Sequence, residues 1–177
     1  MYPVIRLIKE RFRVRGAALA LSGTHVSRHI CWPWDLDLWM ELNNGRTLTL
    51  YDLGRLPMMI RLGFISALAS RGWGLTVAGA SVRYRRRIRP FHRFETRSRV
   101  LGWDQRFLYV EQSMWRRGEA LNHILVRLAA TDQGGILTPK KLIAAAGHKE
   151  PCSPALPDWV AAWVEADGKR PWPPMAG

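Results

Sequence analysis

The chain is poor in cysteine and in acidic residues. Its two cysteines, Cys31 and Cys152, lie far apart, so the sequence predicts neither a disulfide framework nor a metal site with CxxC spacing. This usage favours a reducing, cytoplasmic setting. Only 14 Asp and Glu oppose 27 Lys and Arg, which gives a formal net charge of +13. Such a field attracts nucleic acid, acidic lipid or a phosphorylated small molecule, and a solvated basic surface is the alternative interpretation.

Long hydrophobic runs are also missing. The apolar stretch Gly16–Leu21 follows several basic residues, but it is too short for the core of a signal peptide or for a membrane span. Residues 1–20 are therefore expected to form a basic N-terminal arm, either solvated or leading as a strand into the domain. Peripheral contact of this segment with a membrane surface is an alternative. At 177 residues, 47% of them hydrophobic, the chain is expected to fold around one core.

The first half of the sequence predicts one strand and then a buried helical region. Thr24–Trp32 is rich in β-branched and aromatic residues, as strands are. Asn43 is a good helix N-cap, because its side-chain oxygen accepts a hydrogen bond from an unpaired backbone N–H. The residues that follow are apolar on nearly every side of a helix, which indicates a buried one. Pro57 is expected to kink this helix, or to begin a second segment that runs to Ser70.

The second half predicts four consecutive strands and two short helices. The strands are expected at Leu75–Ile88, Phe94–Leu101, Arg106–Trp115 and Ala120–Thr131, and the helices at Pro139–Ala146 and Pro157–Ala166. Consecutive strands with short turns form an antiparallel sheet, and an apolar helix must cover it. The expected class is α+β, with a curved antiparallel sheet wrapped around a long central helix. Residues 21–135 would form this domain and residues 136–177 a C-terminal helical extension.

The densest polar cluster lies between the first strand and the helix. Asp35 and Asp37 precede the helix start at Asn43–Arg46, and Asp52 and Arg55 follow it. Free N–H groups and the positive end of the helix dipole could stabilise the oxyanion that forms when a thioester is attacked. A carboxylate nearby could attack directly or activate water. From spacing alone, the same residues could simply cap turns and the helix.

Residues Trp34–Arg46 resemble the active-site segment of the 4-hydroxybenzoyl-CoA thioesterase-like hotdog family. That segment typically reads D-x-D, a variable pair, G-H-V-N-N, then a small residue and an aromatic one. Asp52–Arg55 and Gly102–Asp104 are similar to further positions in the thioesterase-superfamily-member-6-like branch. The resemblance covers about Thr24–Thr131. It implies the hotdog fold, a homodimer or a dimer of dimers, and acyl sites at the dimer interface.

The resemblance also implies roles for individual residues. Asp37 takes the position of the catalytic carboxylate, Asn43 and Asn44 shape the helix start, and the N–H groups of residues 45–47 form the oxyanion site. Expected catalytic residues are thus Asp37, Glu41, Asn43 and Asn44, and expected substrate-binding residues include Asp35, Gly45, Arg46 and Thr47. Met40-Glu41 replaces the family's Gly-His, and Thr47 replaces its aromatic residue. A further acid in this loop raises the pKa of a neighbouring carboxylate, or Glu41 serves as the base itself.

An arginine cluster follows in the sequence. Strand alternation would place Arg83, Arg85 and Arg87 on one face, where they could bind the phosphates of coenzyme A. An RNA backbone or plain solvation of a strand end are alternatives. Since no RNA-binding signature is present, nucleic acid is not the expected partner.

These observations predict an acyl-CoA thioesterase that needs no metal and no cofactor, with acyl-CoA as its substrate. The alternative is a non-catalytic hotdog protein that binds acyl-CoA or a protein partner. Acyl chain length depends on the shape of the pocket, which the sequence does not specify.

Overall fold

The protein is described by a computed structural model at residues 3–13, 18–149, 152–171 and 173–174. The elements are, in order, α1 (Val4–Arg13), β1 (Thr24–Ile30), the 3-10 helix η1 (Pro33–Asp35), α2 (Asn44–Arg61), α3 (Phe64–Arg71), β2 (Gly74–Tyr84), β3 (Arg93–Trp103), β4 (Leu108–Arg116), β5 (Glu119–Asp132), β6 (Gly135–Leu137), α4 (Pro139–Ala145) and α5 (Asp158–Gly168). This set confirms the expected α+β class.

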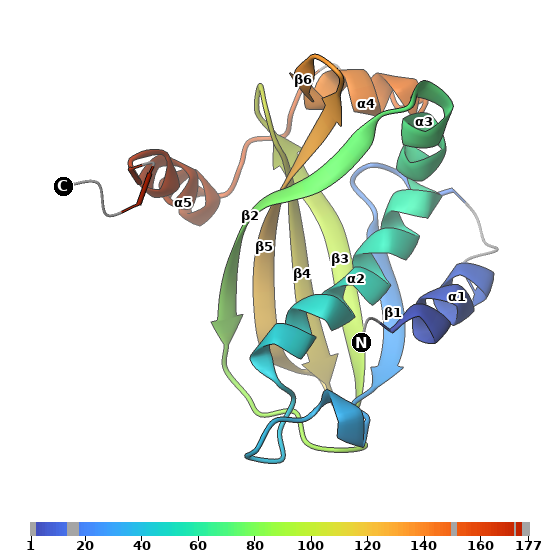
Figure 1. The fold of residues 1–177 in the computed structure, drawn as a ribbon, viewed down its shortest axis with the longest axis vertical. Helices are drawn as coiled ribbons and strands as arrows, with labels where there is room; N and C mark the ends of the chain where they lie inside the picture. The colour runs from blue at the N-terminus through green and yellow to red at the C-terminus, as the bar shows by residue number, and fades with distance from the viewer. Residues whose placement is uncertain (1–2, 14–17, 150–151, 172, 175–177) are drawn as a thin grey trace.

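The strands form one antiparallel sheet in the order β1-β3-β4-β5-β2, and β6 pairs with β5. Figure 1 shows α2 lying across the inner face of the curved sheet. Residues on that face alternate with exposed ones along β1 and β3, as a half-buried strand requires. The core lies between α2 and the sheet, and Leu50, Leu53 and Met58 of α2 are fully buried there. The expected central helix with a sheet curved around it is therefore confirmed.

Several element boundaries differ from the expectation. α2 runs through Pro57 without ending, and the break comes at Gly63, whose φ of +74° suits glycine. Pro57 is buried, so packing against the sheet outweighs the loss of one helical hydrogen bond. β2 stops at Tyr84 instead of Ile88, because the N–H groups of Arg85 and Arg86 both turn to the carbonyl of Leu121.

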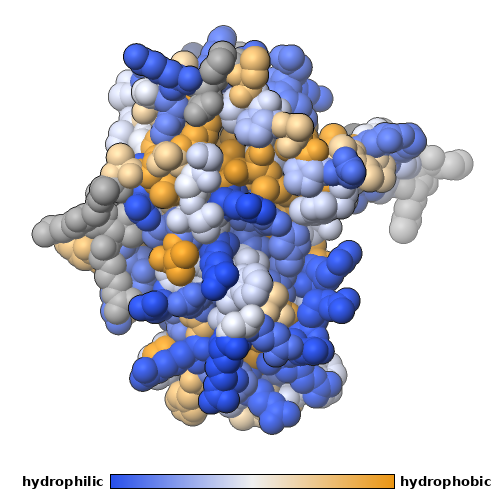
Figure 2. Space-filling model, turned by 180° about the vertical axis from the view of Figure 1, so that it is seen from behind, coloured by the Kyte–Doolittle hydropathy of each residue, from blue (hydrophilic) through white to orange (hydrophobic). Residues whose placement is uncertain are grey.

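The two ends of the chain also contribute more structure than expected. The N-terminal arm contains the helix α1, not a strand, and its residues 14–17 lie outside the described part of the chain. β6 begins at residue 135 and α4 follows it, yet Leu142 and Ile143 of α4 belong to the main core. α5 covers the outer face of the sheet, where Val160 packs with Tyr109 and Leu125. The rest of that face is strongly hydrophilic in its lower half (Figure 2).

Across the described residues, no helix combines the length and the apolar character needed to span a membrane.

We expect the stability of the fold to depend on pH through His25. His25 is buried on β1 and its Nδ1 atom lies 3.2 Å from Nη1 of Arg61. Burial, together with the Arg61 guanidinium, lowers the pKa of His25 to about 4. Since the unfolded chain binds this proton below about pH 6.5, the contribution is fully present above that pH and is lost as pH falls towards 4.

Urea unfolding at a series of pH values tests this dependence. The free energy of unfolding should fall from about pH 6.5 to about pH 4, and His25→Gln should make that fall shallower. An identical slope in the wild type and the variant would contradict the role of His25.

Candidate active site at the start of α2

Asp35 is the buried centre of the segment before α2. Its side chain is 0% exposed, and its two oxygens are bound by guanidinium groups from both sides. Nη2 of Arg6 lies 2.7 Å from Oδ2, and Nε of Arg46 lies 2.7 Å from Oδ1. The backbone N–H of Trp32 also donates to Oδ2 at 3.0 Å. Asp35 thus connects α1, η1 and the first turn of α2, and contact with a substrate would require one of the arginines to move.

Asp37 organises the loop that precedes α2. Its Oδ1 accepts the backbone N–H of Trp39 at 2.9 Å and of Glu41 at 3.4 Å. Its own N–H donates to the carbonyl of Glu41 at 2.8 Å, and Met40 adopts a positive φ of 58° in the turn. Both side-chain hydrogen bonds fall on Oδ1, so Oδ2 keeps its lone pairs for another group. Asp37 therefore caps the turn through Oδ1, as the turn-capping interpretation predicts, and its Oδ2 remains available to another group.

Two backbone N–H groups in the first turn of α2 have no acceptor among the described residues. Asn43 is the N-cap, since its Oδ1 accepts the N–H of Arg46 at 3.0 Å, which confirms the expected cap. The N–H of Thr47 donates to the carbonyl of Asn43, and so does its hydroxyl. Within the described residues, the N–H groups of Asn44 and Gly45 have no protein acceptor. Of the expected donors at residues 45–47, only Gly45 is thus available, and Asn44 joins it.

A pocket of about 220 Å³ lies beside this helix start. It is lined by Glu41, Leu42, Asn44, Thr47, Tyr84, Arg85, Arg86, Arg87, Ile88 and Asn122. The carboxylate of Glu41 forms an ion pair with Nε of Arg87 at 3.0 Å. The hydroxyl of Tyr84 donates to the carbonyl of Asn44 at 3.2 Å. Burial raises the pKa of Tyr51, and its protonated hydroxyl donates to Asn122.

The structure distributes the predicted site residues over two hollows. The pocket just described brings together Glu41, Asn44, Thr47, Arg85 and Arg87. A second, more apolar groove of about 1060 Å³ on the α1 side is lined by Asp35, Asn43 and Arg46 among others. Asp37, Gly45 and Arg83 line neither hollow.

The residues expected from the sequence did not include Asn122, Arg86 and Tyr84, which also line the pocket. A signal for Asn122 was present, because it is a buried amide within the otherwise apolar strand β5. The arginines were expected on one strand face, which is wrong for Arg85 and Arg87, since β2 ends before them. They reach the pocket from an irregular segment instead.

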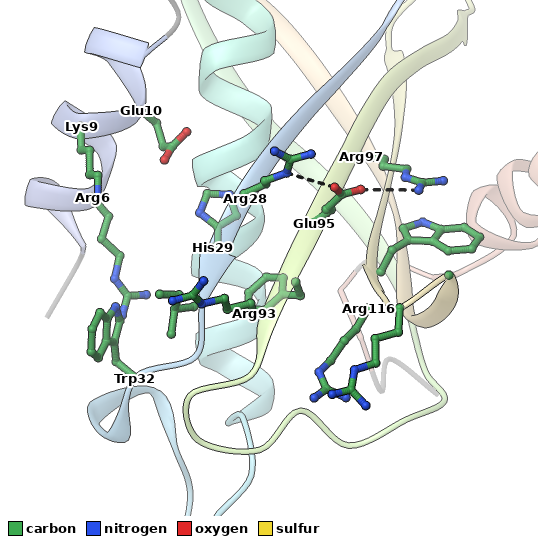
Figure 3. Close-up of a pocket in the computed structure, with 15 residues that line it drawn as sticks. Arg6, Lys9, Glu10, Arg28, His29, Trp32, Arg93, Glu95, Arg97 and Arg116 are labelled. Carbon is green, nitrogen blue, oxygen red and sulfur yellow. Dashed lines mark hydrogen bonds and ion pairs between the residues drawn. The ribbon is translucent and has the colours of Figure 1, made fainter.

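A third hollow, about 670 Å³, lies on the outer face of the sheet beside α1 (Figure 3). Its lining includes Lys9, Arg28, Arg93, Arg97, Arg116 and Arg117. Arg28 and Arg97 both pair with Glu95, at 3.1 and 3.5 Å. The guanidinium of Arg97 also lies 4.5 Å from the ring centre of Trp115. We call this hollow the basic groove.

The described residues hold no cluster of His, Cys, Asp and Glu that could bind a metal ion. Both cysteines are free, Cys31 buried and Cys152 exposed.

Known proteins are similar to this chain in sequence. Residues 31–164 match the family model of the thioesterase-like superfamily. Protein THEM6 of Xenopus laevis is 30% identical over 161 residues, which cover 90% of this chain and 76% of the relative. Protein THEM6 of Drosophila melanogaster is 27% identical over 148 residues, with coverage of 82% and 75%.

Solved structures share the fold. The probable thioesterase YbaW of Escherichia coli superposes with a TM-score of 0.64 at 13% identity, covering 69% of this chain and 95% of that one. The DHNA-CoA thioesterase of Staphylococcus aureus gives a TM-score of 0.60 at 15% identity, covering 82% and 91%. The hotdog fold expected from the sequence is therefore confirmed.

The buried carboxylate of Asp35 should be essential to stability. Asp35→Ala leaves the guanidinium groups of Arg6 and Arg46 without their shared acceptor, and removing one partner of a buried ion pair costs about 3–5 kcal/mol. Asp132→Ala is the matched control, because Asp132 only caps an exposed turn through the N–H of Gly134. Urea unfolding measures both variants, and equal stabilities would refute the central place given to Asp35.

Proposed function

Because the chain belongs to the thioesterase-like superfamily, we propose that it hydrolyses acyl-CoA thioesters in the pocket beside the start of α2. One observation carries the proposal: the N–H groups of Asn44 and Gly45 are free at the positive end of an 18-residue helix. Donors fixed in this way stabilise the oxyanion of a tetrahedral intermediate. The proposal needs no metal ion and no organic cofactor.

Asp37 is the proposed catalytic carboxylate. It does not line the pocket itself, so we propose that the thioester carbon reacts at the mouth of the pocket, between the loop of Asp37 and the helix start. Its free Oδ2 takes a proton from water, and the resulting hydroxide adds to the thioester carbonyl carbon. The carbonyl oxygen becomes an oxyanion held by the N–H groups of Asn44 and Gly45. Collapse of this intermediate breaks the carbon–sulfur bond, and the proton on Asp37 passes to the leaving thiolate. In an alternative route with the same overall reaction, the carboxylate itself attacks the thioester and forms an anhydride, which water then hydrolyses.

The arginines at the pocket suit the nucleotide part of coenzyme A. Arg85, Arg86 and Arg87 line the pocket and are all exposed, and guanidinium groups suit phosphates that extend from it. Arg86 is paired with Glu119 at 2.6 Å, so a phosphate would compete with that carboxylate for it. A volume of about 220 Å³ accommodates the reacting end of an acyl-CoA and not the whole molecule. The ion pair with Glu41 holds Arg87 at the rim.

A second function has support from the residues that depart from the family pattern. Glu41 is engaged with Arg87, and Thr47 is 1% exposed with its hydroxyl bound to Asn43. Because threonine has no ring, position 47 offers no aromatic surface to an acyl group. These features favour a non-catalytic protein that binds acyl-CoA, and turnover decides between the two.

Thiol release from acyl-CoAs of increasing chain length tests the catalytic proposal. Asp37→Asn keeps an oxygen for the loop N–H groups but removes the base, so kcat/KM should fall by about 100-fold or more. Asp132→Asn is the matched control, since Asp132 accepts a loop N–H in the same way far from the pocket, and it should stay close to the wild type.

Glu41→Gln distinguishes whether Glu41 or Asp37 is the catalytic base. If this variant loses turnover while Asp37→Asn retains it, Glu41 is the base. If the wild type binds acyl-CoA without any turnover, the non-catalytic function is correct.

The proposal includes a homodimer formed through β2. This 11-residue strand is the edge of the sheet, and most of its residues are exposed or half-exposed. A long unprotected edge with small side chains such as Ala78, Gly79 and Ala80 is suited to pair with a second copy. The pocket lies at the end of β2, next to Tyr84, so such a partner would stand beside it. A cytoplasmic location stays a prediction.

Sedimentation equilibrium tests the dimer. Ala80→Lys places two like charges across the paired edges and should weaken dimerisation by more than about tenfold. Ala161→Lys, on an exposed position of α5, is the control. A wild-type monomer, or equal dissociation constants for the two variants, would contradict the β2 interface.

A further inference from the structure

Large apolar side chains gather at one end of the molecule, where a folded surface rarely exposes so many. The loop before α2 exposes Leu38 by 94% and Trp39 by 77%. Trp34 of η1 is 68% exposed, and Phe91, in the loop before β3, is 62% exposed. In α1, Ile5 is 84% exposed. Leu38 and Ile5 must project from the surface, since almost nothing covers them.

These side chains belong to one continuous region. Trp34 stacks on Trp32 with 5.3 Å between ring centres, and Trp32 meets Phe91 edge-on at 6.2 Å. Ile5 and Trp34 line the same groove. We call this region, formed by Ile5, Trp34, Leu38, Trp39 and Phe91, the apolar corner. In Figure 1 the loop before α2 and the loop before β3 lie together at the lower end of the molecule.

Cations surround the apolar corner on two sides. On one side, Arg87 and Arg89 line a small hollow together with Trp39. On the other side lies the basic groove, where Lys9 and Arg93 are found with Trp32 (Figure 3). The pKa of His92, beside Phe91, is lowered by burial and then by Arg116, Arg89 and Arg117, which reflects the concentration of positive charge. Of the described acids in this region, Asp35, Glu41 and Glu95 are paired with arginines. Asp37, next to Leu38, accepts only backbone N–H groups and is the one negative charge there that no described arginine offsets.

We propose that the apolar corner docks on the surface of an anionic lipid bilayer. Tryptophan, phenylalanine and leucine side chains of a projecting loop are suited to the boundary between headgroups and acyl chains. The surrounding arginines and Lys9 would lie at the level of acidic headgroups, where each cation adds to the attraction. The attachment is peripheral and does not require the proposed hydrolysis.

The form of the region favours a bilayer over a protein or a nucleic acid. Leu38 and Ile5 project outward, whereas a protein partner most often receives anchors in a pocket of fixed shape. An RNA backbone would pair with the arginines but would leave these aliphatic side chains in water. The hydrogen bonds of Asp37 hold the loop, so its tip is already ordered before contact with lipid.

Vesicle co-sedimentation of the full chain tests the proposal. The protein should bind vesicles of phosphatidylcholine with phosphatidylserine, bind pure phosphatidylcholine much less, and lose affinity as salt rises. Leu38→Ser combined with Trp39→Ser should weaken binding by about tenfold or more. Arg89→Gln should weaken it by about fivefold, on acidic vesicles only.

Matched controls lie at the opposite end of the molecule. Ile136→Ser in β6 removes an exposed apolar side chain, and Lys140→Gln in α4 removes an exposed cation. Neither should change vesicle binding. Trp39→Phe should keep the affinity but lose much of the quenching of tryptophan fluorescence by brominated lipid, which shows directly that this loop enters the bilayer.

Three results would overturn the proposal. The first is equal vesicle binding by the wild type and the double serine variant. The second is no binding of the wild type to acidic vesicles. The third is a change of oligomeric state in the double serine variant without any effect on vesicles, which would make the apolar corner an interface between protein copies.

Discussion

The buried carboxylate of Asp35 is the contact on which the candidate site depends. Two guanidinium groups, from Arg6 and Arg46, and one backbone N–H, from Trp32, share its two oxygens. Removing these charges from water costs free energy, and the short, charge-assisted hydrogen bonds offset that cost only while all partners are present. The arrangement therefore fixes α1, η1 and the first turn of α2 in one relative position. The backbone of Asp35 adds to it by accepting the N–H of Asn43 at 3.0 Å.

This centre positions the start of α2, whose N–H groups are divided as in other capped helices. Asn43 satisfies Arg46 and Thr47, and the two N–H groups before them stay available. Asp37 uses one oxygen to close the preceding loop and keeps the other. The same loop carries Leu38 and Trp39 to the surface, so a single turn links the proposed chemistry to the proposed lipid contact. An amphiphilic substrate such as an acyl-CoA is compatible with both.

The sequence predicted those features that local rules decide. Asn43 was identified as a helix cap because capping depends on the residue itself, and the strand β5 was predicted to within a residue at each end because its signal is strong. Features decided by distant contacts were missed. Pro57 lies within α2 because packing of a buried helix outweighs the local penalty, and the pairing of Arg6 with Asp35 spans 29 positions. Arg85 and Arg87 were expected on a strand face, but β2 ends at Tyr84 and they line the pocket from an irregular segment.

A crystal structure with a non-hydrolysable thioether analogue of an acyl-CoA tests the central claim most directly. The account predicts the analogue's reacting end in the pocket lined by Glu41, Asn44 and Thr47. Any oxygen in place of the thioester carbonyl should accept the N–H groups of Asn44 and Gly45, and the phosphates should contact Arg85–Arg87. An analogue bound only in the basic groove, or with its reacting end away from the start of α2, would contradict the account.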